Sequence, residues 1–352
     1  MDAVLQAMAE RVGAAAQRGQ PLRLHGGGTK DFYGNGLAGD PFDTRAYAGI
    51  VSHESSELVV TARGGTPLAE LEHALAETSQ MLPFEPPHFG AGATLGGCVA
   101  AGLSGPRRAS AGALRDFVLG ARLLDGRGRV LSFGGQVMKN VAGYDVSRLL
   151  AGSLGTLGVI LEVSLKVLPR PATEATLRLE ATQREALEWM NRWAGRPLPV
   201  SATSFAQGEL CVRLSGAPAA VRAARQALGG AELPRAAEFW TSLREHTHPA
   251  FATDRPLWRL SVPSTTPPLG LAGAQLIEWG GALRWLASDA ESGTIREVAR
   301  RAGGHATLFR ARDKTCGAFA PLSVASARLH RELKAAFDPA GIFNRGRLYP
   351  DL

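Results

Sequence analysis

Two glycine-rich segments in the first half of the chain restrict the folds open to it. The first contains Gly26–Gly28, directly after the short apolar stretch Leu22–Leu24, and the second is Gly90–Gly97. Glycines in such runs let backbone N–H groups close on an anion, because no Cβ stands in the way. Two such loops in one domain predict a ligand with a long phosphate-bearing body, and a dinucleotide fits that description. Ordinary turns are the alternative interpretation of either loop taken alone.

The common dinucleotide and mononucleotide motifs are absent. The second segment approaches G-x-G-x-x-G, but Leu95 stands where the third glycine belongs. The residues before it, Pro83–His88, contain three prolines and cannot form the central parallel strand that this motif requires. No G-x-x-x-x-G-K-[ST] string occurs. We therefore expect neither a Rossmann nor a P-loop fold.

Composition and charge narrow the class of protein. A chain of 352 residues is long enough for two domains with separate cores. The formal net charge is +7, yet the basic residues are scattered and form no block. We therefore expect no nucleic-acid partner. A basic surface for an acidic partner subunit or for anionic lipid headgroups remains an open alternative to a merely solvated face.

The cysteines and the N-terminal residues bear on the cellular compartment. Cys98, Cys211 and Cys316 are far apart and form no C-x-x-C pair. We therefore expect no metal site, neither a structural zinc nor an iron–sulfur cluster held by this chain. Their odd number and wide spacing suit a reducing cytosol. The first residues predict an amphipathic helix rather than a signal peptide, and no segment is apolar enough to span a membrane, so we expect a cytoplasmic protein.

Secondary-structure signals fall into two blocks separated by Pro169–Pro171. In the first block, the patterns predict helices at 1–19 and 67–76 and strands at 22–24, 50–51, 58–61, 117–124, 129–133 and 159–168. The strand at 159–168 alternates apolar and polar residues and is expected to be half-buried. The second block predicts strands at 175–179, 210–214, 257–262, 275–279, 283–287 and 306–309, and helices at 184–193, 219–228, 236–246 and 294–302. A last helix at 323–337 precedes a turn-rich tail.

Hairpins between these strands predict an antiparallel sheet in the second block, with helices on one of its faces. Asp125–Gly126 is a hairpin signal in the first block, and Gly280–Gly281 predicts a two-residue hairpin turn in the second. The fold class is α+β, with domains at 1–170 and 171–322 and a C-terminal segment at 323–352. The core of the second domain is expected to contain four tryptophans: Trp240, Trp258, Trp279 and Trp285.

Long phrases of this chain resemble a known flavoprotein family. The stretch 83–171, which begins PFEPPHFGAGATLGGC, resembles the FAD-binding domain of the vanillyl-alcohol oxidase (PCMH-type) superfamily. MKNVAGYD, GSLGTLGVI and DPAGIFNRGRLYP are similar to its glycolate oxidase and D-lactate dehydrogenase branch. LPFEPPHFG, GLSGPRRASAG and FGGQVMKNVAGYD look closest to the FAD-binding E subunits of bacterial glycolate oxidases. The resemblance is strong at 20–171 and in the tail, and weaker between them.

This resemblance implies a fold, a cofactor and a set of cofactor-binding residues. The fold is a PCMH-type FAD domain of two subdomains, an antiparallel α+β cap domain, and a C-terminal tail that returns to the FAD domain. The cofactor is FAD, with its diphosphate between the two glycine loops and its ring system against apolar backbone. The residues carried over from the family are His25, Gly26, Gly27, Gly28, Thr29, Lys30, Ala93, Thr94, Gly96, Gly97, Ser104, Gly105, Arg108, Gly112, Gly155, Gly158, Val159, Ile160 and Asn344.

The chain departs from the family pattern in two places. Members that bind FAD covalently carry a histidine just after the first glycines, where this chain has Thr29, so we expect non-covalent FAD. Hydroxyacid dehydrogenases of this branch carry a G-D-G-N-x-H cluster, which binds a metal and removes the hydroxyl proton. This chain has no such string. We therefore predict no metal and leave the catalytic residues unassigned.

Several residues keep two interpretations each. His25 either contacts the phosphates or bonds to backbone at the end of a strand. His305 is the best single candidate for a catalytic base, and a structural histidine at a strand end is the alternative; His246 and His248 form the only close histidine pair in the cap. Four residues either close a loop near the cofactor or form a buried turn: Lys139, Asn140, Tyr144 and Asp145.

The function implied by the resemblance is that of an FAD-binding subunit in a multi-subunit glycolate oxidase, which oxidises glycolate to glyoxylate. The implied partners are a second FAD-binding subunit, an iron–sulfur subunit and a small 2-hydroxy acid substrate, with membrane association only through the complex. The missing cluster predicts that the flavin is an electron relay or a weak second site. Two alternatives remain: a self-sufficient 2-hydroxyacid dehydrogenase, and a non-catalytic subunit with a structural flavin.

Overall fold

The computed structural model describes residues 2–135 and 145–352. Lys139, Asn140 and Tyr144 lie outside the described residues. Asp145 is described, and it caps a short helix. Its carboxylate accepts hydrogen bonds from the backbone N–H of Arg148 at 3.2 Å and from the hydroxyl of Ser147 at 3.0 Å.

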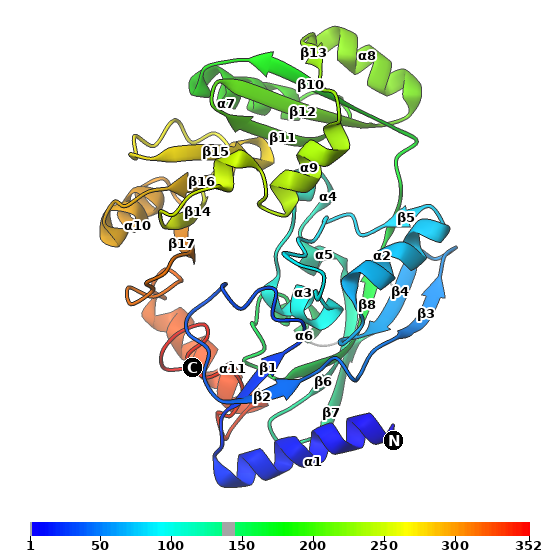
Figure 1. Cartoon of the computed structure of the whole chain (residues 1–352), viewed down its shortest axis with the longest axis vertical. Coiled ribbons are helices and arrows are strands. Elements are labelled where there is room, and N and C mark those ends of the chain that lie inside the picture. Colours follow the sequence, from blue (N-terminus) through cyan, green and yellow to red (C-terminus); the bar gives the residue numbers. More distant parts are fainter. Residues whose placement is uncertain (1, 136–144) are drawn as a thin grey trace.

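The N-terminal part of the chain forms a five-stranded antiparallel sheet of order β3-β4-β8-β6-β7 and two small two-stranded sheets (Figure 1). Leucines of α2 and α3 pack against the five-stranded sheet and form its core with Val163 and Leu165. The elements are α1 (Ala3–Arg18), β1 (Leu22–His25), β2 (Asp40–Asp43), β3 (Ile50–Glu54), β4 (Val59–Arg63), α2 (Leu68–Glu77), β5 (Gln80–Met81), α3 (Leu95–Ala101), α4 (Arg108–Ala111), α5 (Leu114–Phe117), β6 (Val118–Leu124), β7 (Val130–Gly134), α6 (Val146–Leu149), β8 (Val159–Lys166) and β9 (Leu168–Pro169).

The second part forms an eight-stranded antiparallel sheet of order β13-β10-β12-β11-β15-β16-β14-β17. Its elements are β10 (Thr173–Glu180), α7 (Gln183–Ala194), β11 (Val200–Ala206), β12 (Glu209–Gly216), α8 (Pro218–Leu228), β13 (Ala231–Glu232), α9 (Ala236–Arg244), η1 (Pro249–Phe251), β14 (Leu257–Ser261), β15 (Ala274–Glu278), η2 (Trp279–Gly281), β16 (Leu283–Ala287), α10 (Ser292–Arg301) and β17 (His305–Arg310). The α+β class and the antiparallel sheet are as predicted. We refer to this part as the cap and to the part before it as the N-terminal domain.

The prediction that helices cover one face of the cap sheet is wrong. Leu210 and Val212 of β12 pack in a core with residues of α7 and α8. Cys211, between them, packs in a different cluster with Trp240 of α9. Because successive strand residues point to opposite faces, α9 lies on the face opposite α7 and α8. That second face is the one turned toward the N-terminal domain.

Two local predictions also need correction, and one strand of the cap sheet was missed. Strand β8 is almost wholly buried rather than half-buried, because its polar residues pair inside the sheet; Ser164, for example, bonds to Thr61 at 2.8 Å. The connection between β15 and β16 is not a two-residue turn but spans Trp279–Ala282, with Trp279 in a left-handed conformation (φ 54°). Strand β11 was not predicted, because Val200–Ala206 has many small and polar residues and no clear period.

The C-terminal segment returns to the N-terminal domain. After the cap, α11 (Val324–Phe337) packs the ring of Phe337 against Phe133 of β7, and the residues that follow pair with β1. The backbone N–H of Leu22 donates to Ile342 at 2.7 Å, and Phe343 forms a parallel bridge with Leu22. Both tail residues are fully buried in a core shared with α1. Within the described parts of the chain, no helix has the length and hydropathy needed to cross a membrane.

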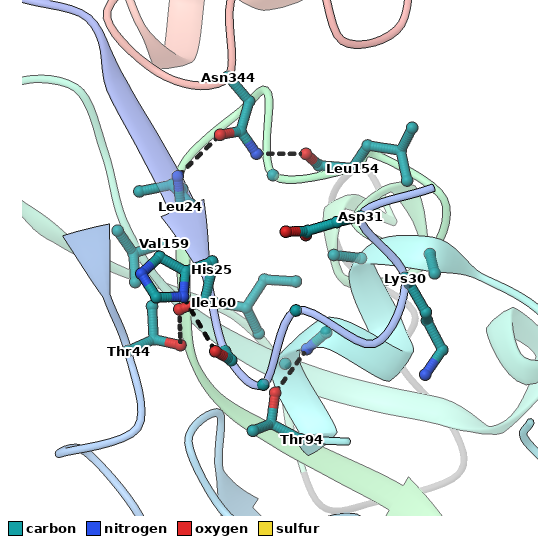
Figure 2. A pocket seen from close by; sticks show the side chains of 18 of the residues that line it. Leu24, His25, Lys30, Asp31, Thr44, Thr94, Leu154, Val159, Ile160 and Asn344 are labelled. Atoms are coloured by element: carbon teal, nitrogen blue, oxygen red, sulfur yellow. Dashed lines mark hydrogen bonds between the residues drawn. The ribbon is translucent and has the colours of Figure 1, made fainter. Parts of the chain in front are cut away.

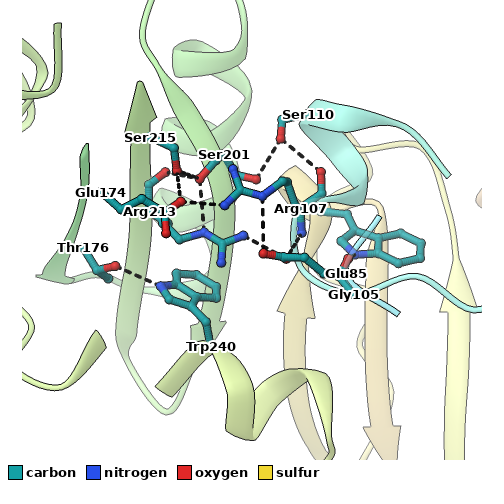
Figure 3. A network of polar contacts seen from close by, with 11 residues as sticks. Glu85, Gly105, Arg107, Ser110, Glu174, Thr176, Ser201, Arg213, Ser215 and Trp240 are labelled. Atoms are coloured by element: carbon teal, nitrogen blue, oxygen red, sulfur yellow. Dashed lines mark hydrogen bonds and ion pairs between the residues drawn. The ribbon is translucent and has the colours of Figure 1, made fainter. Parts of the chain in front are cut away.

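A buried ionic network joins the N-terminal domain to the cap (Figure 3). Glu85 accepts from Arg107 Nε at 3.3 Å and from Arg213 Nη2 at 2.9 Å. Arg107 also reaches Glu174 on β10 at 2.5 Å, so this arginine contacts carboxylates of both domains, whereas Arg213 of the cap contacts Glu85 of the N-terminal domain. Burial alone would raise the pKa of Glu85, but Arg213 and then Arg107 hold that pKa below its ordinary value. The carboxylate is therefore ionised at neutral pH and links the two sheets.

An apolar cluster beside this network completes the junction. It combines Leu103 and Leu154 of the N-terminal domain with Trp240, Trp285 and Phe309 of the cap. The four predicted core tryptophans are all buried, with exposed fractions of 2 to 5%. Three of them, however, belong to this junction cluster rather than to the interior of the cap alone.

Candidate functional site

A pocket opens between the end of β1, the start of α3 and the start of β8 (Figure 2). It contains about 780 Å³ of empty space, part of it open to solvent. We call it the loop pocket. The predicted site residues in its wall are His25, Gly26, Gly27, Gly28, Thr29, Lys30, Thr94, Gly96, Gly97, Gly155, Gly158, Val159, Ile160 and Asn344. The wall also contains residues that were not predicted: Leu24, Asp31, Leu37, Thr44, Ala100, Ala101, Leu154 and Arg347.

The two glycine loops meet backbone to backbone in this wall. A Cβ added to Gly27 would lie 1.6 Å from the carbonyl oxygen of Gly92, so only glycine allows this approach. Gly28 has a φ of +69°, which an L side chain rarely adopts. Thr94 is the N-cap of α3, and its hydroxyl accepts a hydrogen bond from Gly97 N at 3.2 Å. The glycine spacing in the sequence therefore reflects one close contact between loops that are distant in the chain.

The tail supplies a polar clamp for the far side of the pocket. Figure 2 shows the Asn344 amide between two backbone segments. Its Oδ1 accepts from Leu24 N at 2.8 Å, and its Nδ2 donates to Leu154 O at 2.6 Å. This amide fixes the end of β1 relative to the loop before β8. Both polar atoms of the Asn344 side chain are therefore bonded to protein backbone, and through these bonds Asn344 positions the wall of the pocket.

Two cations stand near one end of the loop pocket. Lys30 Nζ donates to the carbonyl oxygen of His88 at 3.2 Å, and burial lowers the pKa of this amine against the opposing effects of Cys98 and Glu245. Arg347 donates to the carbonyl of Asp31 at 2.8 Å and so holds the first loop in shape. Burial lowers the pKa of Arg347 as well. Two cations, the Asp31 carboxylate and glycine-rich backbone thus lie on the wall of the loop pocket.

Other residues of the wall are apolar. Val159, Ile160 and Leu154 are buried there and present hydrocarbon to the pocket. A long ligand with an anionic middle and flat, weakly polar ends matches this distribution of charge and hydrocarbon. FAD has this form, so the residues present fit it.

His25 bonds to backbone in this structure. Its Nδ1 lies 3.0 Å from the carbonyl oxygen of Gly26, and its own carbonyl accepts from the Thr44 hydroxyl at 3.2 Å. This geometry matches the interpretation of a histidine that bonds to backbone at a strand end. The ring nevertheless lines the pocket.

Five predicted residues lie away from the wall of the loop pocket. Ala93 is buried in the core of the five-stranded sheet. Ser104 and Gly105 line a second, smaller cavity at the domain junction. The Arg108 guanidinium stands 4.4 Å from the ring centre of Trp279, and Gly112 ends α4 with a φ of +113°. Ser104, Gly105 and Arg108 border the cap, and sequence order alone did not separate these residues from the glycine loops.

The cap histidines do not converge. The imidazole of His246 stacks on Phe251 with ring centres 3.9 Å apart, and His248 accepts a hydrogen bond from Ala250 N at 3.2 Å at the start of η1. His305 is exposed at the first residue of β17 and lines neither cavity. Among the described residues, no group of three His, Cys, Asp or Glu side chains is placed to hold a metal ion.

Comparisons with known proteins agree with this geometry. The family described as "FAD binding domain" matches residues 5–134. The chain is 50% identical over 347 residues to the glycolate oxidase subunit GlcE of Escherichia coli (strain K12), covering 99% of this chain and 98% of that protein. It is 31% identical over 196 residues to a D-lactate dehydrogenase of Archaeoglobus fulgidus, covering 53% of this chain and 42% of that protein.

A glycolate oxidase subunit GlcD of Bacillus subtilis (strain 168) is 32% identical over 128 residues, covering 36% of this chain and 27% of that protein. Among solved structures, an alkyldihydroxyacetonephosphate synthase has a TM-score of 0.65 at 15% identity, covering 96% of this chain and 75% of that one. At that identity the likeness concerns the fold alone.

Proposed function

Because this chain belongs to the family of the glycolate oxidase subunit GlcE, we propose that it is an FAD-carrying subunit of a multi-subunit glycolate oxidase. The reaction is oxidation of glycolate to glyoxylate. The electrons pass from the flavin to an iron–sulfur subunit, and a second FAD-binding subunit completes the complex. Relatives named GlcD and D-lactate dehydrogenase support FAD-dependent oxidation of small 2-hydroxy acids.

We assign the FAD diphosphate to the loop pocket. The observation that carries this proposal is the backbone contact between Gly27 and Gly92, which brings two N–H-rich loops to one wall beside Lys30. Apolar side chains such as Val159 would pack against a flat ring of the cofactor. Thr29 follows the first glycines, and no histidine stands there to form a covalent link, so we propose that FAD is bound non-covalently.

The roles of the protein follow from this assignment. When bound, FAD supplies the acceptor for the two electrons that leave the hydroxy acid. The glycine loops orient its diphosphate, and Lys30 and Arg347 offset part of its negative charge. Asn344 holds the end of β1 and the loop before β8 in fixed positions relative to each other. The division at 1–170, 171–322 and 323–352 corresponds, in this proposal, to FAD domain, cap and a segment that closes the FAD site.

The absorption spectrum of the purified chain tests the cofactor. We expect visible flavin bands, or bands that appear after incubation with FAD and removal of the excess. Acid precipitation should release the flavin to the supernatant, because no covalent bond holds it. A folded protein that stays colourless after this treatment contradicts the assignment, and flavin that stays in the precipitate contradicts non-covalent binding.

Copurification tests the complex. An affinity tag on this chain, expressed with the genes of its own complex, should retain a second flavoprotein and a protein with iron–sulfur absorption. Glycolate-dependent reduction of an artificial acceptor should be much faster in the complex than in the isolated chain. A full rate from the isolated chain would instead favour the self-sufficient dehydrogenase.

A further inference from the structure

The junction between the N-terminal domain and the cap contains a second cavity with about 320 Å³ of empty space, part of it open to solvent. We call it the junction cavity. It is lined from the N-terminal side by Phe89 and Ser104, and from the cap by His246, Arg259 and Glu278, with Phe309 as an apolar wall. It is much smaller than the loop pocket, so only a small molecule fits.

The junction cavity adjoins the loop pocket. Lys30, which lines the loop pocket, places its Nζ 5.7 Å from the ring centre of Phe89, which lines the junction cavity. Leu154 of the loop pocket belongs to the same apolar cluster as Phe309 and Trp285. A ligand in the junction cavity would therefore lie close to one end of a cofactor held in the loop pocket.

Arg259 brings unneutralised positive charge to this cavity. It is half-buried on β14, and its guanidinium lies 5.2 Å from the ring centre of Trp279. Within residues 2–135 and 145–352 it has neither an ion pair nor a hydrogen bond through its side chain. The two other buried arginines of the junction, Arg107 and Arg213, both bind carboxylates. The side-chain nitrogens of Arg259 are not among the solvent-shielded polar atoms that lack a partner, so they are accessible to a ligand that enters the cavity.

The neighbours of Arg259 make an anion the fitting occupant. Arg108 approaches the same indole from 4.4 Å, and the pKa of Arg108 is lowered, first by burial and then by the charge of Arg259. The carboxyl group nearby, Glu278, accepts a hydrogen bond from Trp285 and has its pKa raised by burial to about 7. This acid is therefore partly protonated at neutral pH and opposes an incoming anion only weakly.

His246 adds a polar group without a protein partner. Its Nδ1 is shielded from solvent and has no hydrogen-bond partner among the described residues. Its backbone is left-handed, with a φ of 55°, and the ring is held between Phe251 and Trp285. Burial, followed by the charges of Arg310 and Arg259, lowers the pKa of His246 well below its ordinary value. The imidazole is thus neutral and offers a hydrogen-bonding atom next to the cation.

We propose that the junction cavity is a binding site for a small 2-hydroxy carboxylate, with Arg259 holding the carboxylate and the unpartnered His246 ring facing the hydroxyl group. An arginine fork matches a carboxylate in geometry and charge. The proposal rests on the proposed function, because it places the carboxylate of the oxidised substrate in this chain. It implies that the chain has a substrate site of its own and is more than an electron relay.

The test uses the FAD-loaded chain and two ligands of equal size. Glycolate carries the carboxylate, and glycolamide is its neutral counterpart. Each is titrated anaerobically, with binding followed by calorimetry and by the change in flavin absorption. We expect glycolate to bind and to perturb the flavin spectrum, and glycolamide to bind at least tenfold more weakly. Equal binding of the two, or no glycolate binding at millimolar concentrations, overturns the proposal.

Variants locate the site. Arg259→Gln should weaken glycolate binding by at least tenfold, the usual loss for a charge-assisted hydrogen bond, and leave the FAD content unchanged. Arg255→Gln is the control, because Arg255 is exposed and pairs with Asp289 away from the cavity; it should bind as the unaltered chain does. Unchanged glycolate affinity in Arg259→Gln overturns the proposal.

Two further measurements keep the test decisive. If Arg259→Gln does not fold, Arg259→Lys replaces it, because lysine keeps the charge but lacks the two-pronged guanidinium. We expect Arg259→Lys to bind glycolate severalfold more weakly. Unaltered glycolate affinity would refute the role of Arg259 in holding the carboxylate. The absorption spectrum reports FAD retention separately from ligand affinity. If the chain retains FAD but does not bind glycolate, the carboxylate site is refuted and the FAD proposal is unaffected. A colourless chain refutes the FAD proposal, and calorimetry with glycolate then still tests the cavity.

Discussion

Replacing Glu278 by Gln should stabilise the protein at alkaline pH and not at acid pH. Glu278 is buried, and burial raises its pKa from 4.5 to about 7, with the hydrogen bond from Trp285 and the charge of Arg259 acting in the opposite direction. A carboxyl group with a raised folded-state pKa binds its proton more tightly when folded. The folded state therefore loses stability relative to the unfolded state as pH rises through the window from 4.5 to about 7.

The size of the effect follows from that window. Each tenfold change in proton affinity corresponds to about 1.4 kcal/mol, so ionising Glu278 costs about 3 kcal/mol of folding free energy once the pH exceeds 7. Glutamine resembles the protonated acid, can still accept from Trp285, and removes this cost. For a chain of 352 residues that unfolds in one step, 3 kcal/mol corresponds to about 4 °C in melting temperature.

The assay is thermal unfolding of the FAD-loaded chain and of Glu278→Gln between pH 5 and pH 8. The difference in melting temperature should be small at pH 5 and should grow to about 4 °C in favour of the variant at pH 8. Glu209→Gln, at an exposed residue of β12, is the control for the substitution of an amide and should not reproduce the gain of about 4 °C at pH 8. A difference for Glu278→Gln that is equal at both pH values, or that favours the unaltered chain at pH 8, refutes the reasoning.

Three further substitutions test other parts of the structure. Gly27→Ala places a Cβ 1.6 Å from a backbone carbonyl oxygen and should lower the affinity for FAD at least tenfold, as measured by fluorescence titration. Gly13→Ala is the control, because its Cβ meets nothing within 4 Å, and it should leave the affinity for FAD unchanged. Equal affinities in the two variants would contradict the loop contact. Arg213→Met leaves a buried carboxylate with one cation fewer and should lower the free energy of unfolding by about 3 kcal/mol in guanidinium titrations; a loss below 1 kcal/mol would mean that the network contributes little. Lys334→Met removes a buried amine that is bonded to two carbonyls and a buried aspartate, and it should lower the free energy of unfolding by about 3 kcal/mol as well. The control Arg328→Met, at an exposed residue, should leave the free energy of unfolding almost unchanged. Similar losses in the two variants would refute the role of the tail.

The glycine loops and the tail could be predicted from sequence because their residue types are forced by local backbone geometry. Gly27 has no space for a side chain, and Asn344 has a backbone conformation that asparagine tolerates. Such positions leave recognisable phrases in the chain. Fourteen of the predicted cofactor residues consequently fall in one wall.

The junction cavity could not be predicted in the same way. Its residues come from segments far apart in the chain, such as Phe89, His246 and Phe309, and nothing in the local sequence connects them. The pKa of Glu278 depends on burial that only the assembled domains create. Strand β11 was missed for a related reason, since buried serines such as Ser201 are satisfied by hydrogen bonds that a hydropathy pattern does not reveal.

The return of the tail to β1 has a consequence for biosynthesis. Leu24 and Asn344, whose hydrogen bond closes the loop pocket, are 320 residues apart. At the usual speed of bacterial or eukaryotic ribosomes, roughly 15 to 60 s pass between the emergence of one and of the other. During that interval the nascent N-terminal domain lacks the part of the loop-pocket wall that the tail supplies, and it lacks the buried tail segment that pairs with β1. The complete loop pocket therefore forms only after the tail has been synthesised.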